Sequence, residues 1–403
     1  MTNDPQTAFP APIPMKPSGS MGAIKIILGI LAALVALLLG LIVLVLIGVE
    51  NGPLALLIGI VSATVPVPVY LVLVLWIDRY EAEPAWMLAT AFFWGALVAV
   101  FFAFLINTVA NVAVESMTNS ARAGRTFGAV VSAPIVEESA KALILFIFFF
   151  WKKDEFDGVI DGIVYAAMAG LGFAMTENIQ YYGKAVMEGG GGGLTFVLIL
   201  RGALAPFSHP MFTSLTGIGL GLARQSRNTA VKWIAPIMGL LAAISMHSIW
   251  NGSGVIFGGI AFILTYVIIM IPAFFIMLVV IILALRREGQ IVRENLIADY
   301  QAGLLTEQEY NQLCTIRGRM GSSFNAFSRG GFGQWQTARQ LNQTASELAF
   351  HRSRVARGLT LADAREREAA YQLALQDLLR RMRGKKKKGP LTKFDHFPAI
   401  DLY

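Results

Sequence analysis

The sequence predicts an all-α, polytopic membrane helix bundle followed by a helical tail on the cytoplasmic side. The chain of 403 residues is 55% hydrophobic and only 15% charged. Its mean hydropathy of +0.60 is too high for a soluble globular protein. The apolar residues also gather into separate runs, each long enough for a helix to cross the hydrocarbon layer, which takes about 20 residues.

About eight such runs can be counted within the predicted membrane domain, residues 21–286. The Pro-rich, polar residues 1–20 before them are expected to be disordered. The first run is too long for a cleaved signal peptide and is interpreted as a retained anchor. The spans are predicted near 22–48, 53–77, 86–114, 128–150, 158–182, 194–223, 231–251 and 259–285.

The distribution of basic residues predicts the orientation of the bundle. Lys152, Arg224 and Arg286 follow spans four, six and eight, which end on one side if the N-terminus is cytoplasmic. The positive-inside rule then puts both termini in the cytoplasm, although Arg122 and Arg125 lie on the opposite side. A Gly run at 189–193 is expected to be a flexible external connector between spans five and six.

The chain becomes polar after the last span. We expect a helical hairpin at 287–317, because Thr306 and Glu309 have the spacing of a capping box, then a Gly-rich linker at 318–333 and a helical tail at 334–384. Residues 385–403 are expected to be a basic, disordered end. The lysine run at 385–388 within it could bind anionic lipid. The hairpin is similar to short bacterial oligomerisation hairpins, so the tail could also self-associate. No motif suggests nucleic acid binding.

Ionisable residues inside the spans are the main indication of function, since charges in hydrocarbon are expensive. Span four carries Glu137, Glu138 and Lys141, with the lysine one helical turn from both carboxylates. Three further polar groups follow in later spans: Glu177-Asn178, His209 with Arg201 two turns earlier, and His247 with Asn251 at i,i+4. The four groups fall in the central-to-outer half of the bundle, with a spread in depth of roughly 10–15 Å, so helix kinks or shifts are needed to bring them together.

These residue types are sufficient for peptide-bond hydrolysis. A carboxyl group kept from water is a competent general base near neutral pH. An imidazole can transfer protons, and an asparagine amide can donate to a developing oxyanion. No Gly-x-Ser-x-Gly or His-Glu-x-x-His motif lies in the spans, and the single cysteine, Cys314, is in the tail. Serine, cysteine and zincin mechanisms are therefore disfavoured, while a divalent metal held by the Glu/His set stays open.

The order of these motifs resembles the PrsW family of intramembrane proteases, which are distant relatives of the CAAX prenyl protease and Abi membrane proteins. The resemblance covers roughly residues 78–252. It rests on Glu137-Glu138-x-x-Lys141, Phe173-x-x-x-Glu177-Asn178, the isolated His209, and His247-x-x-x-Asn251. In the prenyl protease relatives the first motif ends in arginine, one residue later than Lys141 does here. Their second motif ends in histidine, where this chain has Glu177. Both differences argue against CAAX processing.

The resemblance implies a glutamate-dependent hydrolase of the bacterial cell membrane that makes the first cut in a membrane-bound anti-sigma factor on the external side. We expect Glu137 to activate water with Glu138 as its partner, and His209, His247 and Asn251 to complete the catalytic set. The supporting residues are Lys141, Glu177 and Asn178. A divalent metal, if one is bound, is expected on Glu137, Glu177, His209 and His247.

Other functions remain compatible with the residues alone. The Glu/Lys/His chain could relay protons or bind a cation in a transporter or channel, although no inverted repeat is evident. The chain could also be a non-catalytic membrane adaptor whose tail binds partners. Structural interpretations are an ion-pair cluster that locks helices together and, for Arg201, a snorkelling or ion-pairing side chain.

Overall fold

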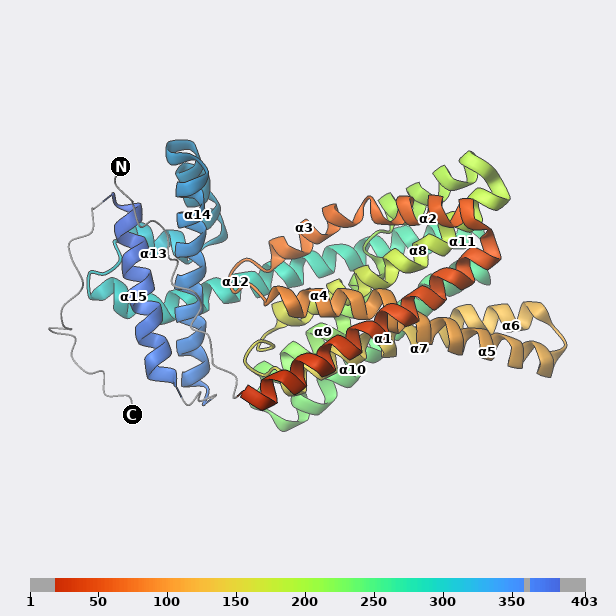
Figure 1. Cartoon of the computed structure of the whole chain (residues 1–403), viewed down its shortest axis with the longest axis horizontal. Helices are drawn as coiled ribbons and strands as arrows, with labels where there is room; N and C mark the ends of the chain where they lie inside the picture. The colour runs from red at the N-terminus through yellow and green to blue at the C-terminus, as the bar shows by residue number, and fades with distance from the viewer. Residues whose placement is uncertain (1–18, 359–362, 385–403) are drawn as a thin grey trace.

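The computed structural model describes residues 19–358 and 363–384, and these residues form helices without any strand. The predictions for residues 1–18 and 385–403 fall outside this range. Figure 1 shows an elongated molecule with two parts, a bundle of long helices and a smaller group of tail helices at one end. The all-α membrane bundle predicted from the sequence is confirmed.

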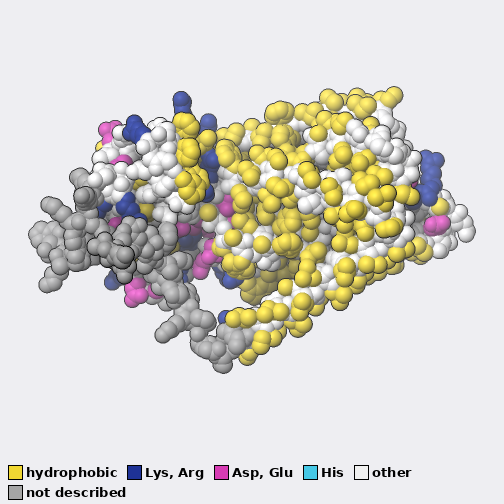
Figure 2. Space-filling view, turned by 45° about the horizontal axis from the view of Figure 1, so that its top comes forward, with side chains coloured by type: hydrophobic (Ala, Val, Ile, Leu, Met, Phe, Trp, Pro, Cys, Tyr) yellow, Lys and Arg dark blue, Asp and Glu magenta, His cyan; other side chains and the backbone are white. Residues whose placement is uncertain are grey.

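Six helical stretches in the described part of the chain are long and apolar enough to cross a membrane. They are Ile24–Asn51, Pro53–Ile77, Ala85–Thr118, Val159–Gln225, Thr229–Val255 and Gly259–Gln301. A hydrophobic belt covers the face of the bundle seen in Figure 2. The number of spans predicted from the sequence, about eight, remains a prediction, because two of its spans fall in the single stretch of 67 residues.

The first half of the bundle consists of helices of very different length that are separated by short interruptions. It comprises α1 (Gly19–Asn51), α2 (Pro53–Thr64), α3 (Val67–Ile77), α4 (Ala85–Phe93), the π-helical segment η1 (Trp94–Ala99), α5 (Val100–Thr118) and α6 (Ala121–Phe127). The break between α2 and α3 lies at Val65–Pro66, where proline interrupts the regular hydrogen bonding of a helix. Helices α5 and α6 form a hairpin that projects from the end of the bundle opposite the tail (Figure 1).

The second half holds the polar groups. It comprises η2 (Gly128–Ser132), α7 (Ala133–Trp151), α8 (Val159–Val197), η3 (Leu198–Leu204), α9 (Ser208–Gln225), α10 (Thr229–Val255), α11 (Gly259–Thr265), η4 (Tyr266–Met270) and α12 (Ile271–Gln301). Helix α7 is not among the six stretches. Its 19 residues include Glu137, Glu138 and Lys141, and these charges make it too polar to be recognised by composition.

Helices α8 and α9 run antiparallel in close contact. A Cβ added to Gly162 would lie 2.1 Å from the carbonyl oxygen of Gly217, and one added to Gly221 would lie 2.5 Å from that of Gly158. The 67-residue stretch would be about 100 Å long as one straight helix, so it has to double back. The Gly run at 189–193, expected to be a flexible connector, is helical except at Gly190, whose φ of 55° only glycine adopts readily.

The tail comprises the end of α12, then α13 (Glu307–Leu313), α14 (Ile316–Ala356) and α15 (Ala364–Met382). The predicted capping box at Thr306 and Glu309 is present at the start of α13. Residues 318–333, expected to be a linker, are helical apart from Gly330 and Gly331. The domain boundaries remain predictions.

Candidate active site

Helix α7 places three ionisable side chains in the interior of the bundle. Glu138 and Lys141 are fully buried, and the Lys141 Nζ lies 2.7 Å from the Glu138 Oε1. The same nitrogen is 3.9 Å from the Glu137 Oε2. The Lys141 ammonium also lies over the ring of Phe173, 4.1 Å from its centroid. A buried charge requires partners of this kind, and removing one is far more costly than burying the intact pair.

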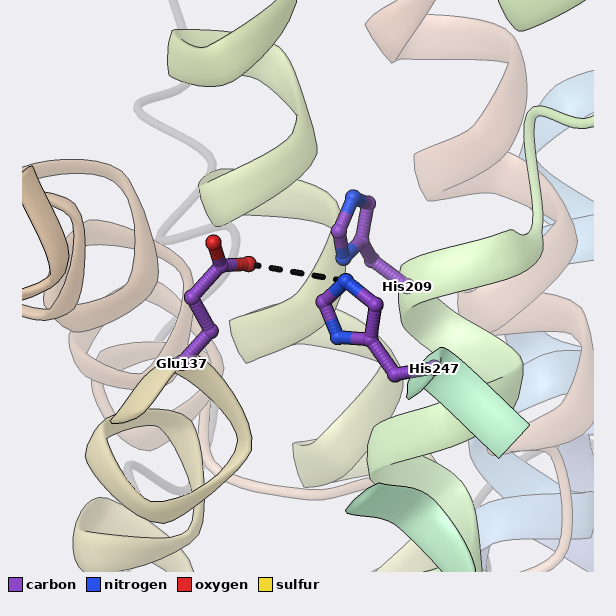
Figure 3. Close-up of side chains that lie close together, drawn as sticks. All are labelled: Glu137, His209 and His247. Carbon is purple, nitrogen blue, oxygen red and sulfur yellow. Dashed lines mark ion pairs between the residues drawn. The ribbon is translucent and has the colours of Figure 1, made fainter. Parts of the chain in front are cut away.

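Two histidines from different helices meet these carboxylates. His209 lies at the start of α9 and His247 in α10, and their rings are 5.1 Å apart. The His247 Nε2 faces the Glu137 Oε2 at 3.9 Å, as Figure 3 shows. His209 can approach because Gly170 of α8 has no side chain. A Cβ there would lie 2.8 Å from the His209 backbone.

Glu138 organises the cluster as a hydrogen-bond acceptor. It accepts from the Lys141 Nζ, from the His247 Nδ1 at 3.0 Å and from the Thr213 Oγ1 at 2.9 Å. An ionised carboxylate can only accept, so the His247 Nδ1 carries a proton towards Glu138, and the Nε2 of the same ring faces Glu137. Sequence reasoning missed Thr213. The only available indication was its position one helical turn after His209.

Glu177 and Arg201 form the second part of the cluster. The Glu177 Oε2 lies 2.9 Å from the His209 Nε2 and also accepts from the Arg201 guanidinium. The Arg201 Nε donates to the Asn178 Oδ1 at 2.6 Å. Arg201, interpreted above as a snorkelling or ion-pairing residue, therefore pairs inside the protein and neutralises the glutamate that contacts His209.

Asn251 is the predicted catalytic residue that does not reach the cluster. Its Nδ2 donates to the backbone oxygen of Ala129 at 2.9 Å, and the neighbouring Ser248 donates to that of Val130 at 2.6 Å. Both acceptors lie in η2, and a π-helical turn disturbs the regular backbone hydrogen bonding. The side chains of α10 thus hold the segment from which α7 begins.

A groove of about 300 Å³ leads to the cluster from the side of α1 and α5. Glu137 and Glu177 lie on its wall, together with apolar residues such as Val43, Val100 and Phe104. Asn107 and Asn111 add polar groups, so the groove can hold an extended peptide as well as apolar side chains. A mixed lining of this kind is typical of a substrate site.

The residues present fit a divalent metal ion. Glu137, His209 and His247 each offer one ligand atom within 4.8 Å of the others. The Glu137 Oε2 is buried and has no hydrogen-bond partner among the described residues. Two imidazoles and a carboxylate match catalytic zinc sites, and the Glu138–His247 contact is the usual way of orienting a ligand histidine. Both His209 nitrogens have partners, Lys141 and Glu177, so His209 has to release one of them to bind a metal.

Comparison with known proteins shows which family the chain resembles. The description "PrsW family intramembrane metalloprotease" matches residues 83–277. Protease PrsW of Geobacillus kaustophilus is 36% identical over 147 residues, which are 36% of this chain and 58% of that protein. Protease PrsW of Bacillus subtilis is 36% identical over 159 residues, 39% of this chain and 65% of that protein. Protease PrsW of Oceanobacillus iheyensis is 28% identical over 193 residues, 48% of this chain and 81% of that protein.

The chain thus spans about three fifths of the length of the first two relatives, and no solved structure matches it significantly. The family match begins just before α4 and ends within α12, so it contains every residue of the Glu/His cluster. Residues 83–277 of this membrane-embedded chain, just under half of its length, are thus similar to the PrsW family.

Proposed function

We propose that the chain is an intramembrane endopeptidase that hydrolyses a peptide bond of a membrane-bound protein. One observation carries the proposal. The Glu137 Oε2 is buried without a hydrogen-bond partner among the described residues, 3.9 Å from the Nε2 of His247, on the wall of a groove of about 300 Å³. A polar atom left in this state in a protein interior requires a ligand, and water or a metal ion with water meets that need.

Each residue of the cluster has a role in this proposal. Glu137 orients the attacking water and accepts its proton. His247 takes this proton from Glu137 at its Nε2 and passes it to the leaving amine, while Glu138 fixes the imidazole by accepting from its Nδ1. Lys141 and Thr213 hold Glu138 in place. Asn251 acts here as a positioning residue for α7 rather than as an oxyanion donor, because it is bound to the η2 backbone.

A divalent metal held by Glu137, His209 and His247 is an alternative form of the proposal, in which these side chains act as ligands instead of the proton-transfer groups named above. When bound, it would polarise the scissile carbonyl and make the attacking water more acidic. Glu177 would then be released from His209 but kept near the site by Arg201. The family description as metalloproteases supports this part of the proposal.

The class of substrate rests on the resemblance. The family likeness supports a first cut in an anti-sigma factor on the external side of a bacterial membrane, with both termini of this chain in the cytoplasm. The groove opens towards α5 and Arg125, close to the α5–α6 hairpin at the end opposite the tail (Figure 1). A substrate segment just outside the membrane could therefore reach Glu137.

Fragment proteomics in cells can test the peptidase. Cells with the native chain, with Glu137→Gln and with Glu188→Gln are compared for membrane-protein fragments. Glu188 is an exposed glutamate of α8 and serves as the matched control. Loss of a general base lowers rates by about 100-fold or more, so fragments that depend on the chain disappear with Glu137→Gln and persist with the control. Equal fragment patterns in all three strains would contradict the proposal and favour a transporter or adaptor.

The metal needs a separate measurement. Purified native chain is expected to contain about one equivalent of a divalent metal by mass spectrometry, on the stoichiometry of a single-ion site, and His247→Ala to contain much less. Cleavage is expected to stop with a chelator and to return when the metal is restored. Metal-free protein that still cleaves would refute the metal while leaving the peptidase proposal intact.

A further inference from the structure

The first part of α14 is a basic and aromatic hairpin that the proposed peptidase site does not use. Residues 316–346, which we call the α14 hairpin, contain no aspartate or glutamate. Arg317, Arg329 and Arg339 are exposed, and none of them has an ion pair within the described residues. The chain reverses at Gly330–Gly331, where φ is −140° and +65°. A segment with this composition attracts negative charge.

The same hairpin exposes large apolar side chains. Met320, Phe324 and Phe327 follow one helical face at i, i+4 and i+7 and are 52%, 70% and 53% exposed. After the reversal, Phe332 is 63% exposed and stacks on Trp335 at a centroid distance of 5.2 Å. Figure 2 shows hydrophobic side chains on the tail with basic side chains beside them, next to the hydrophobic belt of the bundle. Soluble surfaces rarely expose such a row of apolar side chains without a partner.

The base of the hairpin lies at the level where the spans end. The Tyr80 ring lies under the Arg319 guanidinium at 4.3 Å, and its hydroxyl donates to the Cys314 carbonyl. Tyr80 is three residues beyond the end of α3. A Cβ added to Gly289 would lie 2.7 Å from the Cys314 carbonyl oxygen, and Gly289 is less than one turn after Arg287, one of the first charges of α12. The Tyr80 contact places the base of the hairpin beside the residues that follow the end of the second membrane-spanning stretch, Pro53–Ile77.

The hairpin also has the direction needed for contact with a membrane surface. Figure 1 shows α14 lying across the direction of α12 and of the bundle. The spans cross the membrane along the bundle, so α14 runs along its surface. Phenylalanine, tryptophan and arginine are the residues that interfacial helices use, with the aromatic rings at the headgroup level.

From these contacts we propose that the α14 hairpin binds the surface of the membrane that the bundle crosses, through anionic phospholipid headgroups. Arg317, Arg329 and Arg339 pair with the headgroups, and Phe324 and Phe327 enter the boundary with the acyl chains. Each basic residue near an anionic surface strengthens binding about fivefold. The inference concerns the tail and is independent of the proposed peptidase activity.

A spin label on the full-length chain can test this proposal. Asn325→Cys places one label between Phe324 and Phe327, and the natural chain, whose Cys314 is buried, serves as the labelling blank. The chain is reconstituted at one copy per nanodisc in phosphatidylcholine, with or without phosphatidylglycerol. With phosphatidylglycerol we expect the label to be accessible to oxygen and protected from a water-soluble nickel chelate. Phosphatidylcholine alone should weaken that protection.

Two charge-removing variants make the test specific. Replacement of Arg317, Arg329 and Arg339 together by glutamine should lower the bound-to-free ratio of the hairpin about 100-fold, as the product of three fivefold factors. The control replaces three arginines of α15, at 365, 380 and 381, by glutamine. It should leave the label protected from the nickel chelate in discs that contain phosphatidylglycerol. A label that stays in water in both lipids overturns the proposal. Protection that needs two copies per disc, whatever the lipid charge, overturns it in favour of contact between copies.

Discussion

The buried pair of Glu138 and Lys141 gives the most direct test of the site's architecture. Both side chains are fully buried and joined at 2.7 Å. Glu138→Gln leaves the lysine with a 3.9 Å contact to Glu137, the face of Phe173 and the His209 Nδ1 at 3.1 Å, while Lys141→Met leaves a buried carboxylate without its cation. Breaking a buried ion pair from one side costs about 3–5 kcal/mol.

The double variant separates this pair from general damage to the core. Replacing both members removes both charges, so the double variant should be about 3 kcal/mol more stable than the sum of the two single effects predicts. The free energies of unfolding can be measured by reversible titration with dodecyl sulfate in mixed micelles, with tryptophan fluorescence as the readout.

An exposed pair on the same protein provides the control. Lys184 and Glu188 are one turn apart on α8, with side chains 56% and 70% exposed. The same substitutions there, Lys184→Met and Glu188→Gln, should show a coupling energy below about 1 kcal/mol. A coupling energy of the buried pair as small as that of the exposed pair would refute the reasoning that Glu138 is held as an ionised acceptor.

Three further outcomes follow from close contacts and burial. Gly95→Ala should destabilise the bundle by about 1–3 kcal/mol, because its Cβ would lie 1.9 Å from the Ala169 carbonyl oxygen, whereas Gly29→Ala, with open space around it, should be neutral in the same unfolding titration. Burial raises the pKa of Asp78, in the loop after α3, from 3.8 to about 8. Between pH 4 and 8 the Asp78 carboxyl therefore keeps its proton in the folded state and loses it in the unfolded state. The free energy of unfolding should fall over this range by at most about 1.4 kcal/mol per pH unit. Asp78→Asn should reduce this slope. Thr213→Val should lower kcat about fivefold, as expected for one hydrogen bond of about 1 kcal/mol to the carboxylate that orients the catalytic imidazole, and an unchanged kcat would show that Glu138 does not need this donor.

Much of the cluster could be predicted because charges in hydrocarbon are conspicuous in a sequence. Glu137, Glu138, Lys141 and the two span histidines were identified by type and spacing, and the structure brings them together. A spread in depth of roughly 10–15 Å was expected from the sequence, yet the groups meet. A π-helical segment precedes two of the helices that carry them, α7 and α9. Segment η2 ends five residues before Glu137 and η3 ends five residues before His209.

The faces that these helices present could not be predicted. One extra residue in a π-helical turn rotates all that follows by about 100°, and no residue type marks such a turn in a sequence. Asn251 lies one turn after His247 on α10, yet its side chain binds the η2 backbone. Thr213 lies one turn after His209 on α9 and contacts Glu138, a role that its residue type does not indicate.

The organisation of the tail was harder to predict than that of the bundle. Glycines at 318, 321, 330, 331 and 333 suggested a linker, yet only Gly330 and Gly331 leave the helical conformation. Glycine permits a turn but does not require one, and Arg319, buried against Tyr80, holds the first part of the segment in place. Long-range contacts of this kind leave no trace in local sequence.

The glycine contacts between α8 and α9 have a mechanical consequence. The backbones touch at Gly162 and Gly217, and again where Gly170 meets His209. Sliding or separating the two helices would break these backbone contacts. Glu177 of α8 and His209 of α9 therefore move together as parts of one rigid unit. The groove that leads to Glu137 therefore widens by movement of α1 or of the α5–α6 hairpin on its other wall. The rate at which a polypeptide enters would depend on these helices and not on the two histidines.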